Sequence, residues 1–179
     1  MKRVIFFVVV VLIVFSMPMC AKASPSSGPL VTINQADFAL NLTRNKPEDV
    51  LLAIGSAKES SVTISLMEAF FRAEEEIINQ MNSMFRNMIT DYTVMHEVNP
   101  SAALSFQENV HTVINRFYLS GDEIVAEGTD EDGNYFVAVY VSKAVAANEI
   151  NQAVAAGRLA VPAMAGFNFN DYLDNYFGR

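Results

Sequence analysis

The longest uninterrupted apolar run of the chain lies at its N-terminus. Lys2 and Arg3 precede a stretch from Val4 to Phe15 that contains no polar residue. A charged start followed by a short apolar segment is typical of a secretory signal peptide, and this run is shorter than the ~20 residues that a transmembrane helix needs. We therefore expect residues 1–23 to be a signal peptide that is removed during export.

Two processing sites are possible behind this segment. Ala21 and Ala23 flank one variable residue, the pattern that signal peptidase accepts, which predicts a mature chain beginning at Ser24. Cys20, the only cysteine, would instead be the acylated first residue of a lipoprotein, although Met19 is larger than the residue that usually precedes such a cysteine. We favour cleavage before Ser24, with lipidation of Cys20 as the alternative.

Between residues 49 and 157 the pattern predicts a strand, a long helix, a second helix, a hairpin and a third helix. Val50–Gly55 is a short apolar run bounded by turn formers, as in a buried strand. The long helix is indicated by apolar residues at spacings of three and four, with charged and amide residues between them. Its predicted apolar face comprises Met67, Phe70, Phe71, Ile77, Ile78, Met81, Phe85, Met88 and Tyr92.

The second helix is expected after Pro100, and the period then changes. Its predicted face comprises Leu104, Val110, Val113, Ile114 and Phe117. Residues 124–127 and 135–141 are rich in β-branched and aromatic residues and flank a run of turn formers, which predicts an antiparallel hairpin. A helix over 144–156 follows, with Gly157 as its stop. We expect an α+β two-layer sandwich: a three- to four-stranded, mainly antiparallel sheet packed against the long helix and one or two further helices.

Two less regular segments flank this α+β domain. Residues 24–48 are expected to be a linker and N-terminal extension, with a short extended piece near Val31 and Ile33. Residues 158–179 form an aromatic C-terminal tail, which either folds back on the domain or presents exposed rings to another envelope protein. The possible partner surface consists of Phe167, Phe169, Tyr172, Tyr176 and Phe177.

Charge excludes one class of partner. Without residues 1–23 the chain has nine basic and twenty acidic residues, a formal charge of −11 compared with −8 for the whole chain. Nucleic-acid binding is disfavoured, because a protein needs lysine or arginine to displace counterions from phosphates. We expect membrane contact only through the signal peptide or a lipid on Cys20.

Four polar residues could belong to a metal or catalytic site. Glu108 and His111 have the i, i+3 spacing by which di-iron bundles direct two ligands inward, but such a bundle needs a second pair of this kind. His96, the only other histidine, stands beside Glu97 in a predicted loop. A solvated or half-buried histidine is the simpler interpretation. An exported enzyme or metal-dependent protein that uses these four residues is the alternative.

Two segments resemble ligand-binding loops without the complete pattern. Residues 130–134 cluster oxygen ligands, but their spacing differs from that of an EF-hand, and a hairpin turn explains them. Gly55–Ser60 follows a strand and precedes a helix, as a phosphate loop does. Ala57 and Glu59 stand where a Walker motif needs a glycine and a hydroxyl residue. We therefore expect no cofactor and no catalytic residue.

The order of elements resembles a known family. The resemblance is carried by residues 51–57, by the long helix through Ala69 and Ala73, and by residues 119–125 and 133–141. Over about residues 50–155 the chain is similar to the bacterial Lpp-twenty family of small envelope lipoproteins and to the N-terminal domain of flagellar assembly protein T. The resemblance implies a non-enzymatic envelope domain, often with a lipid anchor and sometimes within a flagellar or surface assembly. Together with the export signal and the incomplete motifs, it leads us to expect an interaction or assembly domain of the periplasm or cell envelope that binds other envelope proteins.

The intact mass of the protein recovered from a bacterial host tests the processing site. We expect the mass of a chain that begins at Ser24, because signal peptidase accepts small residues at the two flanking positions. A diacylated chain beginning at Cys20 would contradict this cleavage. Full-length protein in the cytosol would contradict export itself.

Overall fold

The computed structural model describes residue 32, residues 34–116 and residues 122–177. The signal peptide, Cys20, the bond before Ser24, Val31, Ile33 and Phe117 lie outside the described residues. The expectations for these positions therefore stay predictions.

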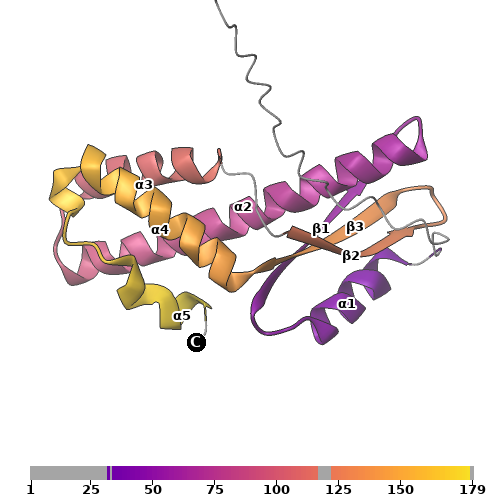
Figure 1. Cartoon of the computed structure of the whole chain (residues 1–179), viewed down its shortest axis with the longest axis horizontal. Coiled ribbons are helices and arrows are strands. Elements are labelled where there is room, and N and C mark those ends of the chain that lie inside the picture. Colours follow the sequence, from indigo (N-terminus) through magenta and orange to yellow (C-terminus); the bar gives the residue numbers. More distant parts are fainter. Residues whose placement is uncertain (1–31, 33, 117–121, 178–179) are drawn as a thin grey trace, which may run out of the picture.

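The described chain has the predicted α+β fold (Figure 1). Its elements are α1 (Gln35–Asn45), β1 (Val50–Ala57), α2 (Val62–Met95), α3 (Pro100–Ile114), β2 (Asp122–Thr129), β3 (Tyr135–Ser142), α4 (Lys143–Ala160), the 3-10 turns η1 (Pro162–Met164) and η2 (Phe169–Tyr172), and α5 (Leu173–Phe177). A three-stranded antiparallel sheet in the order β1-β3-β2 packs against the helices. The predicted hairpin and the predicted order of strand, long helix, helix, hairpin and helix are confirmed.

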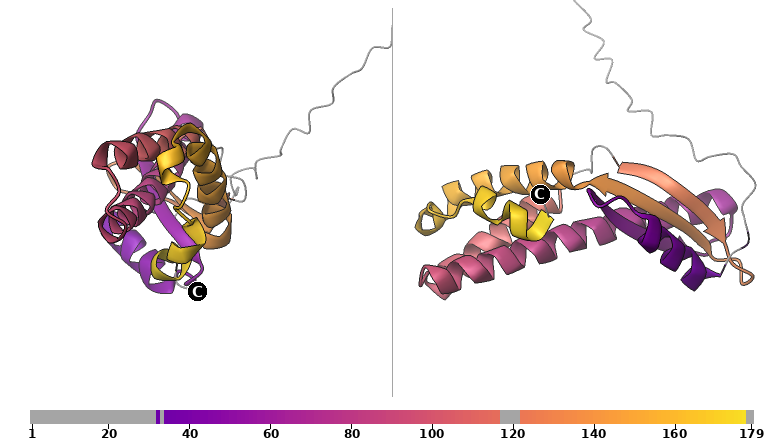
Figure 2. Two further views of the ribbon diagram at one scale, coloured as in Figure 1. Left: turned by 90° about the vertical axis from the view of Figure 1, so that its left-hand side faces the viewer. Right: turned by 90° about the horizontal axis from the view of Figure 1, so that it is seen from below.

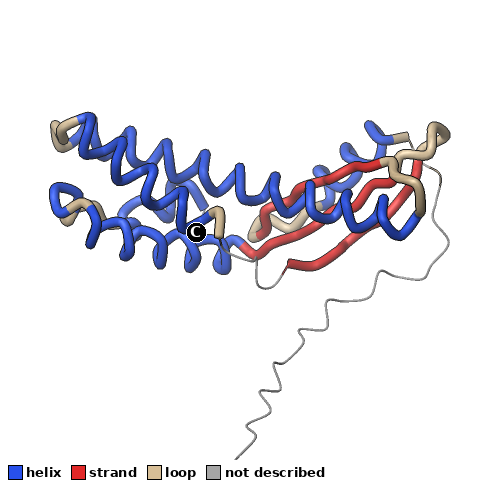
Figure 3. The backbone as a smooth tube through the Cα atoms, turned by 90° about the horizontal axis from the view of Figure 1, so that it is seen from above, coloured by secondary structure: helices blue, strands red, loops and turns tan. Residues whose placement is uncertain are grey.

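The molecule is elongated, and α2 runs along its whole length (Figure 2). The first half of α2 lies on the sheet, and its second half packs with α3, α4 and the C-terminal segment (Figure 3). Its 34 residues correspond to about 50 Å of helix at ~1.5 Å per residue. One helix therefore joins the sheet to the helical half of the molecule.

The first half of α2 lies very close to β1. Alternate residues of β1 point to the helix, and Gly55 is one of them, paired with Val137 of β3. An ideal Cβ placed on Gly55 would lie 1.8 Å from the carbonyl oxygen of Ala69 and 2.6 Å from the backbone nitrogen of Ala73. Ser65, Ala69 and Ala73 are fully buried on the facing side of the helix. Small residues on both elements therefore let the two backbones touch.

This close approach corrects the predicted apolar face of α2. Met67 and Phe71 were expected in the core, but about half of each side chain is exposed, because the small residues face the sheet instead. Farther along the helix large residues form the core as predicted. The buried members there are Ile77, Met81, Phe85, Met88, Ile89 and Tyr92.

Two predictions about α3 and α4 are wrong. Leu104 is exposed, and the buried face of α3 consists of Ala103, Phe106, Val110 and Ile114. Gly157 does not stop α4, which continues to Ala160. A Cβ on Gly157 would lie 2.7 Å from Val110 Cγ2 and 2.9 Å from Phe106 Cε2, so this glycine allows α4 to pack closely on α3.

The segment expected to be a linker and N-terminal extension contains the helix α1. Asn34 caps it, because its side-chain Oδ1 accepts a hydrogen bond from the Ala36 backbone nitrogen at 2.8 Å. The ring of Phe38 lies 6.1 Å from that of Phe136, centroid to centroid. Phe136 is the neighbour of Val137 on β3 and so points away from α2. α1 therefore contacts the face of the sheet opposite to α2.

Substitution Gly55→Ala tests the contact between β1 and α2. We expect the free energy of unfolding to fall by about 2 kcal/mol or more, because the added methyl group meets helix backbone that cannot rotate away. Ser56→Ala is the matched control, since the adjacent residue points to the other face, and it should change stability by about 0.5 kcal/mol or less. Urea unfolding monitored by circular dichroism gives both values. Equal stability of the two variants would contradict the close contact.

Candidate functional site

The aromatic tail folds back onto its own domain. Phe169, Tyr172 and Phe177 are buried, and Tyr176 is partly exposed. Phe167 is fully buried, with its ring centroid 5.2–6.1 Å from those of Phe85, Tyr92, Phe106 and Tyr172. The structure therefore shows the first of the two alternatives, in which the tail folds back on the domain. The expectation that these rings form an exposed partner surface is corrected, because Phe167, Phe169, Tyr172 and Phe177 belong to the buried core and only Tyr176 remains partly exposed.

Polar contacts hold the tail in this position. A guanidinium nitrogen of Arg158 on α4 donates a hydrogen bond to the carbonyl oxygen of Phe167. The hydroxyl of Tyr176 donates to Oδ2 of Asp91 on α2 at 2.6 Å. This hydrogen bond, with partial burial and the charge of Asp91, raises the pKa of Tyr176 to about 12. The tail is thus joined by named contacts to α2 and α4.

The four residues of the candidate metal or catalytic site do not come together. His96 and Glu97 follow α2, whereas Glu108 and His111 lie near the end of α3. His111 lies about 16 Å along the helix axis from Pro100, where α3 begins. Among the described residues, no group of three or more His, Cys, Asp and Glu side chains could hold a metal ion.

His111 has a structural environment between α2 and α3. Its ring centroid lies 6.1 Å from that of Phe85. Its Nε2 and the Oδ1 of Asn82 are both buried and have no hydrogen-bond partner among the described residues. Burial and the charge of Arg86 lower the pKa of His111, whereas an interaction with the backbone of Asn82 raises it. The folded protein therefore favours the neutral ring.

The acidic run between β2 and β3 is a hairpin turn. Asp130 accepts two hydrogen bonds from Asn134, from the backbone nitrogen at 2.8 Å and from the side-chain Nδ2 at 2.7 Å. Gly133 has φ = 80°, the region that favours glycine. Lys58 Nζ donates to the carbonyl oxygen of Asp132 at 2.5 Å. These hydrogen bonds explain the residues of the run as parts of a hairpin turn. Those from Asn134 also lower the pKa of Asp130.

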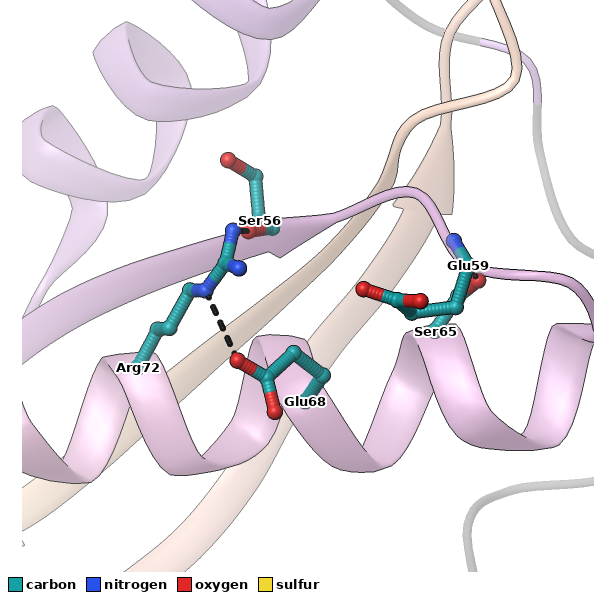
Figure 4. Close-up of polar contacts among 5 residues, drawn as sticks. All are labelled: Ser56, Glu59, Ser65, Glu68 and Arg72. Atoms are coloured by element: carbon teal, nitrogen blue, oxygen red, sulfur yellow. Dashed lines mark hydrogen bonds and ion pairs between the residues drawn. The ribbon is translucent and has the colours of Figure 1, made fainter.

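The loop between β1 and α2 uses its polar groups within the chain (Figure 4). The backbone nitrogen of Glu59, one of the donors that a phosphate loop would direct at a ligand, donates instead to Ser65 Oγ at 2.8 Å. One turn later Arg72 Nε pairs with Glu68 Oε1 at 3.1 Å. Arg72 Nη1 donates to the carbonyl oxygen of Ser56 at 2.6 Å. These contacts bind the start of α2 to the end of β1.

Apart from Leu40 on α1, the exposed large apolar side chains of the sheet half lie on α2. We call Ile64, Met67 and Phe71 the outer face of α2; they are 50%, 53% and 48% exposed and recur at i, i+3 and i+7. This spacing places them on successive turns of one side of the helix. The sequence pattern assigned the larger two to the core. The signal that could have revealed the correct face is the pair Ala69 and Ala73, small residues at i, i+4 spacing.

A second group of exposed apolar residues lies at the far end of α2. It comprises Val94 and Met95 in the last turn of α2, Leu104 on α3 and Leu159 at the end of α4. The side chains of Val94 and Met95 are 78% and 68% exposed, more than those of the outer face. They do not form an i, i+3, i+7 row, and Met95 is therefore a suitable control for the outer face. No helix of the described ranges has both the length and the apolar composition to cross a membrane.

His111→Gln tests the burial of the imidazole. The pKa of His111 is lowered in the folded state, so folding is favoured by the neutral ring above the ordinary value of 6.5, and this contribution is lost as the pH falls below it. We expect the wild type to lose more stability than His111→Gln between pH 7.5 and pH 5. Thermal unfolding at several pH values measures this, and a variant curve parallel to that of the wild type would contradict it.

Comparison with known proteins gives no information about these surfaces. No family model matches the chain, no curated protein matches it, and no solved structure matches it. The resemblance to the Lpp-twenty family therefore stays a prediction from the sequence pattern. The function has to be argued from the described residues themselves.

Proposed function

We propose that this chain is an exported protein of the bacterial cell envelope whose folded part is a non-enzymatic interaction or assembly domain. The observation that carries the proposal is the outer face of α2, where Ile64, Met67 and Phe71 are about half exposed at helical spacing. Apolar side chains that recur at i, i+3 and i+7 are the anchors by which one helix docks on another protein. The outer face of α2 is therefore the proposed contact surface.

The contact with the sheet prevents α2 from burying this face. Rotation of the helix would bring Met67 or Phe71 against Gly55, where even one methyl group has no room. The same rotation would expose Ala69 and Ala73, which are fully buried. The outer face is thus held in place by the fold, and a partner can cover it without any rearrangement of the sheet.

The surrounding charge suggests the chemistry of the partner. Residues 58–76 contain five acidic and two basic residues. Glu68 and Glu75 lie on α2 beside the outer face, four residues after Ile64 and Phe71 respectively. We infer that the partner is a helix of another envelope protein with an apolar centre and a basic rim. Binding should weaken as salt rises, because exposed charge pairs are screened.

Export and the absence of catalysis rest on other observations. The charged start and the apolar run Val4–Phe15 support export. The alternative, an exported enzyme or metal-dependent protein, would use residues that the described structure leaves apart, since His96 and His111 lie near opposite ends of α3. No observation favours it over an interaction domain.

Site-specific photo-crosslinking tests the outer face. A benzophenone amino acid replaces Met67 in one variant and Met95 in a matched control, an exposed methionine of the same helix. In the native host we expect Met67 to give an adduct with one envelope protein, identified by mass spectrometry, at a basic-rimmed helix. Ile64→Ser should reduce its yield about tenfold, in line with the loss of a central apolar anchor of ~1.4 kcal/mol or more.

Three outcomes would contradict the proposal. If the variant at position 67 gives no adduct, the outer face of α2 is not a contact surface. Equal adducts at positions 67 and 95 would show non-specific contact. An adduct of two copies of this chain would replace the envelope partner with self-association.

A further inference from the structure

The outer edge of β1 is a row of backbone groups that no strand of the described chain pairs. In an antiparallel ladder, alternate residues direct both backbone groups to the neighbouring strand and the others direct theirs outward. The carbonyl oxygen of Asp49 accepts a hydrogen bond from the Lys143 nitrogen at 2.8 Å, which places it on the inward set. The outward carbonyl groups are therefore those of Val50, Leu52, Ile54 and Ser56.

Long polar side chains cover three of these four carbonyl groups. Arg72 Nη1 donates to Ser56 O at 2.6 Å, Gln80 Nε2 to Leu52 O at 3.0 Å, and Lys46 Nζ to Val50 O at 3.3 Å. Glu68 orients Arg72 through its ion pair, which Figure 4 shows beside β1. The edge is thus covered by two side chains of α2 and by Lys46, the C-cap of α1, instead of by a strand.

The other edge of the sheet, β2, is protected in a different way. β2 carries Asp122, Glu123 and Glu127, and a β-bulge between Ile124 and Ala126 interrupts its ladder. Charges and bulges both oppose pairing with another strand. β1 has no charged residue and no bulge, so its protection depends on the side chains of Arg72, Gln80 and Lys46.

We propose that the outer edge of β1 is a latent interface for a second copy of this chain, and that Arg72, Gln80 and Lys46 keep it closed. Once Arg72 and Gln80 are removed, Lys46 alone covers only the carbonyl group of Val50, at the start of the strand. Two β1 strands then pair antiparallel about a two-fold axis at Ala53. Val50 then lies opposite Ser56, and Leu52 opposite Ile54, of the second copy. Every outward carbonyl group finds a backbone nitrogen across this axis.

A second copy fits this edge for two reasons. The eight residues of β1 contain no charge and no proline, a composition typical of strands that pair with themselves. The pairing is isologous, so one unpaired edge supplies both halves of the interface. The proposal is independent of the outer face of α2, because Arg72 and Gln80 lie on a different flank of that helix and Lys46 follows α1.

The test compares the oligomeric state of the exported chain with that of the variant Arg72→Ala/Gln80→Ala. We expect a concentration-dependent species of twice the wild-type mass in light scattering coupled to size exclusion. The control Arg86→Ala/Asn87→Ala removes one cation and one amide from exposed positions of the same helix, and it should keep the wild-type mass.

A rescue variant shows whether β1 is the contact. Ile54→Pro removes an outward backbone nitrogen, which pairs with nothing in the described chain, so it should block edge pairing at little cost to the sheet. Added to Arg72→Ala/Gln80→Ala, it should restore the wild-type mass. Circular dichroism verifies folding, and the single variants Arg72→Ala and Gln80→Ala serve if the double variant unfolds.

Two results would overturn the proposal. Folded double and single variants with the wild-type mass at all concentrations would show that the edge needs no cover. A doubled mass that persists with Ile54→Pro would place the contact elsewhere on the molecule. Loss of the photo-crosslink at position 67 would bear on the outer face alone, so the two proposals fail separately.

Discussion

The contact between the backbones of β1 and α2 determines most of what this protein presents to its surroundings. Gly55 leaves no room for a side chain, so only Ser65, Ala69 and Ala73 can face the sheet. This fixes the rotation of the helix about its axis. Ile64, Met67 and Phe71, one or two positions away, are consequently directed to solvent. An exposed apolar face is thus a result of close packing elsewhere on the same helix.

The same rotation places polar residues where the sheet ends. Arg72 and Gln80 lie on the flank of α2 that overhangs β1, and they reach its carbonyl groups because the helix backbone is so close to the strand. A helix held farther away by larger residues would not bring these side chains to the edge. Close packing therefore accounts both for the exposed face and for the covered edge. The two features come from one arrangement of small residues.

In the helical half of the molecule, α2 packs through large side chains instead of small ones. Here α2 presents large residues, and the space between it, α3 and α4 is filled by aromatic side chains from the C-terminal segment. Phe167 contacts rings from α2, from α3 and from its own segment. A tail that reads as a separate aromatic extension is thus part of the core. Local pattern could not show this, because a 3-10 turn and a five-residue helix have no long hydrophobic period.

Within residues 49–157 the sequence by itself determined the elements and their class, because the periods of helix and strand are local properties of the chain. The helix α1, whose pattern is weak, was not predicted. The hairpin, the long helix and the order of elements followed from those periods, and the turn chemistry of Asp130–Asn134 followed from residue type. Only the tertiary structure decided which side of α2 faces the sheet, that Gly157 lies inside a helix, and that the aromatic tail is buried. Each of these depends on the distance between two elements, and that distance is set by side chains far apart in the sequence.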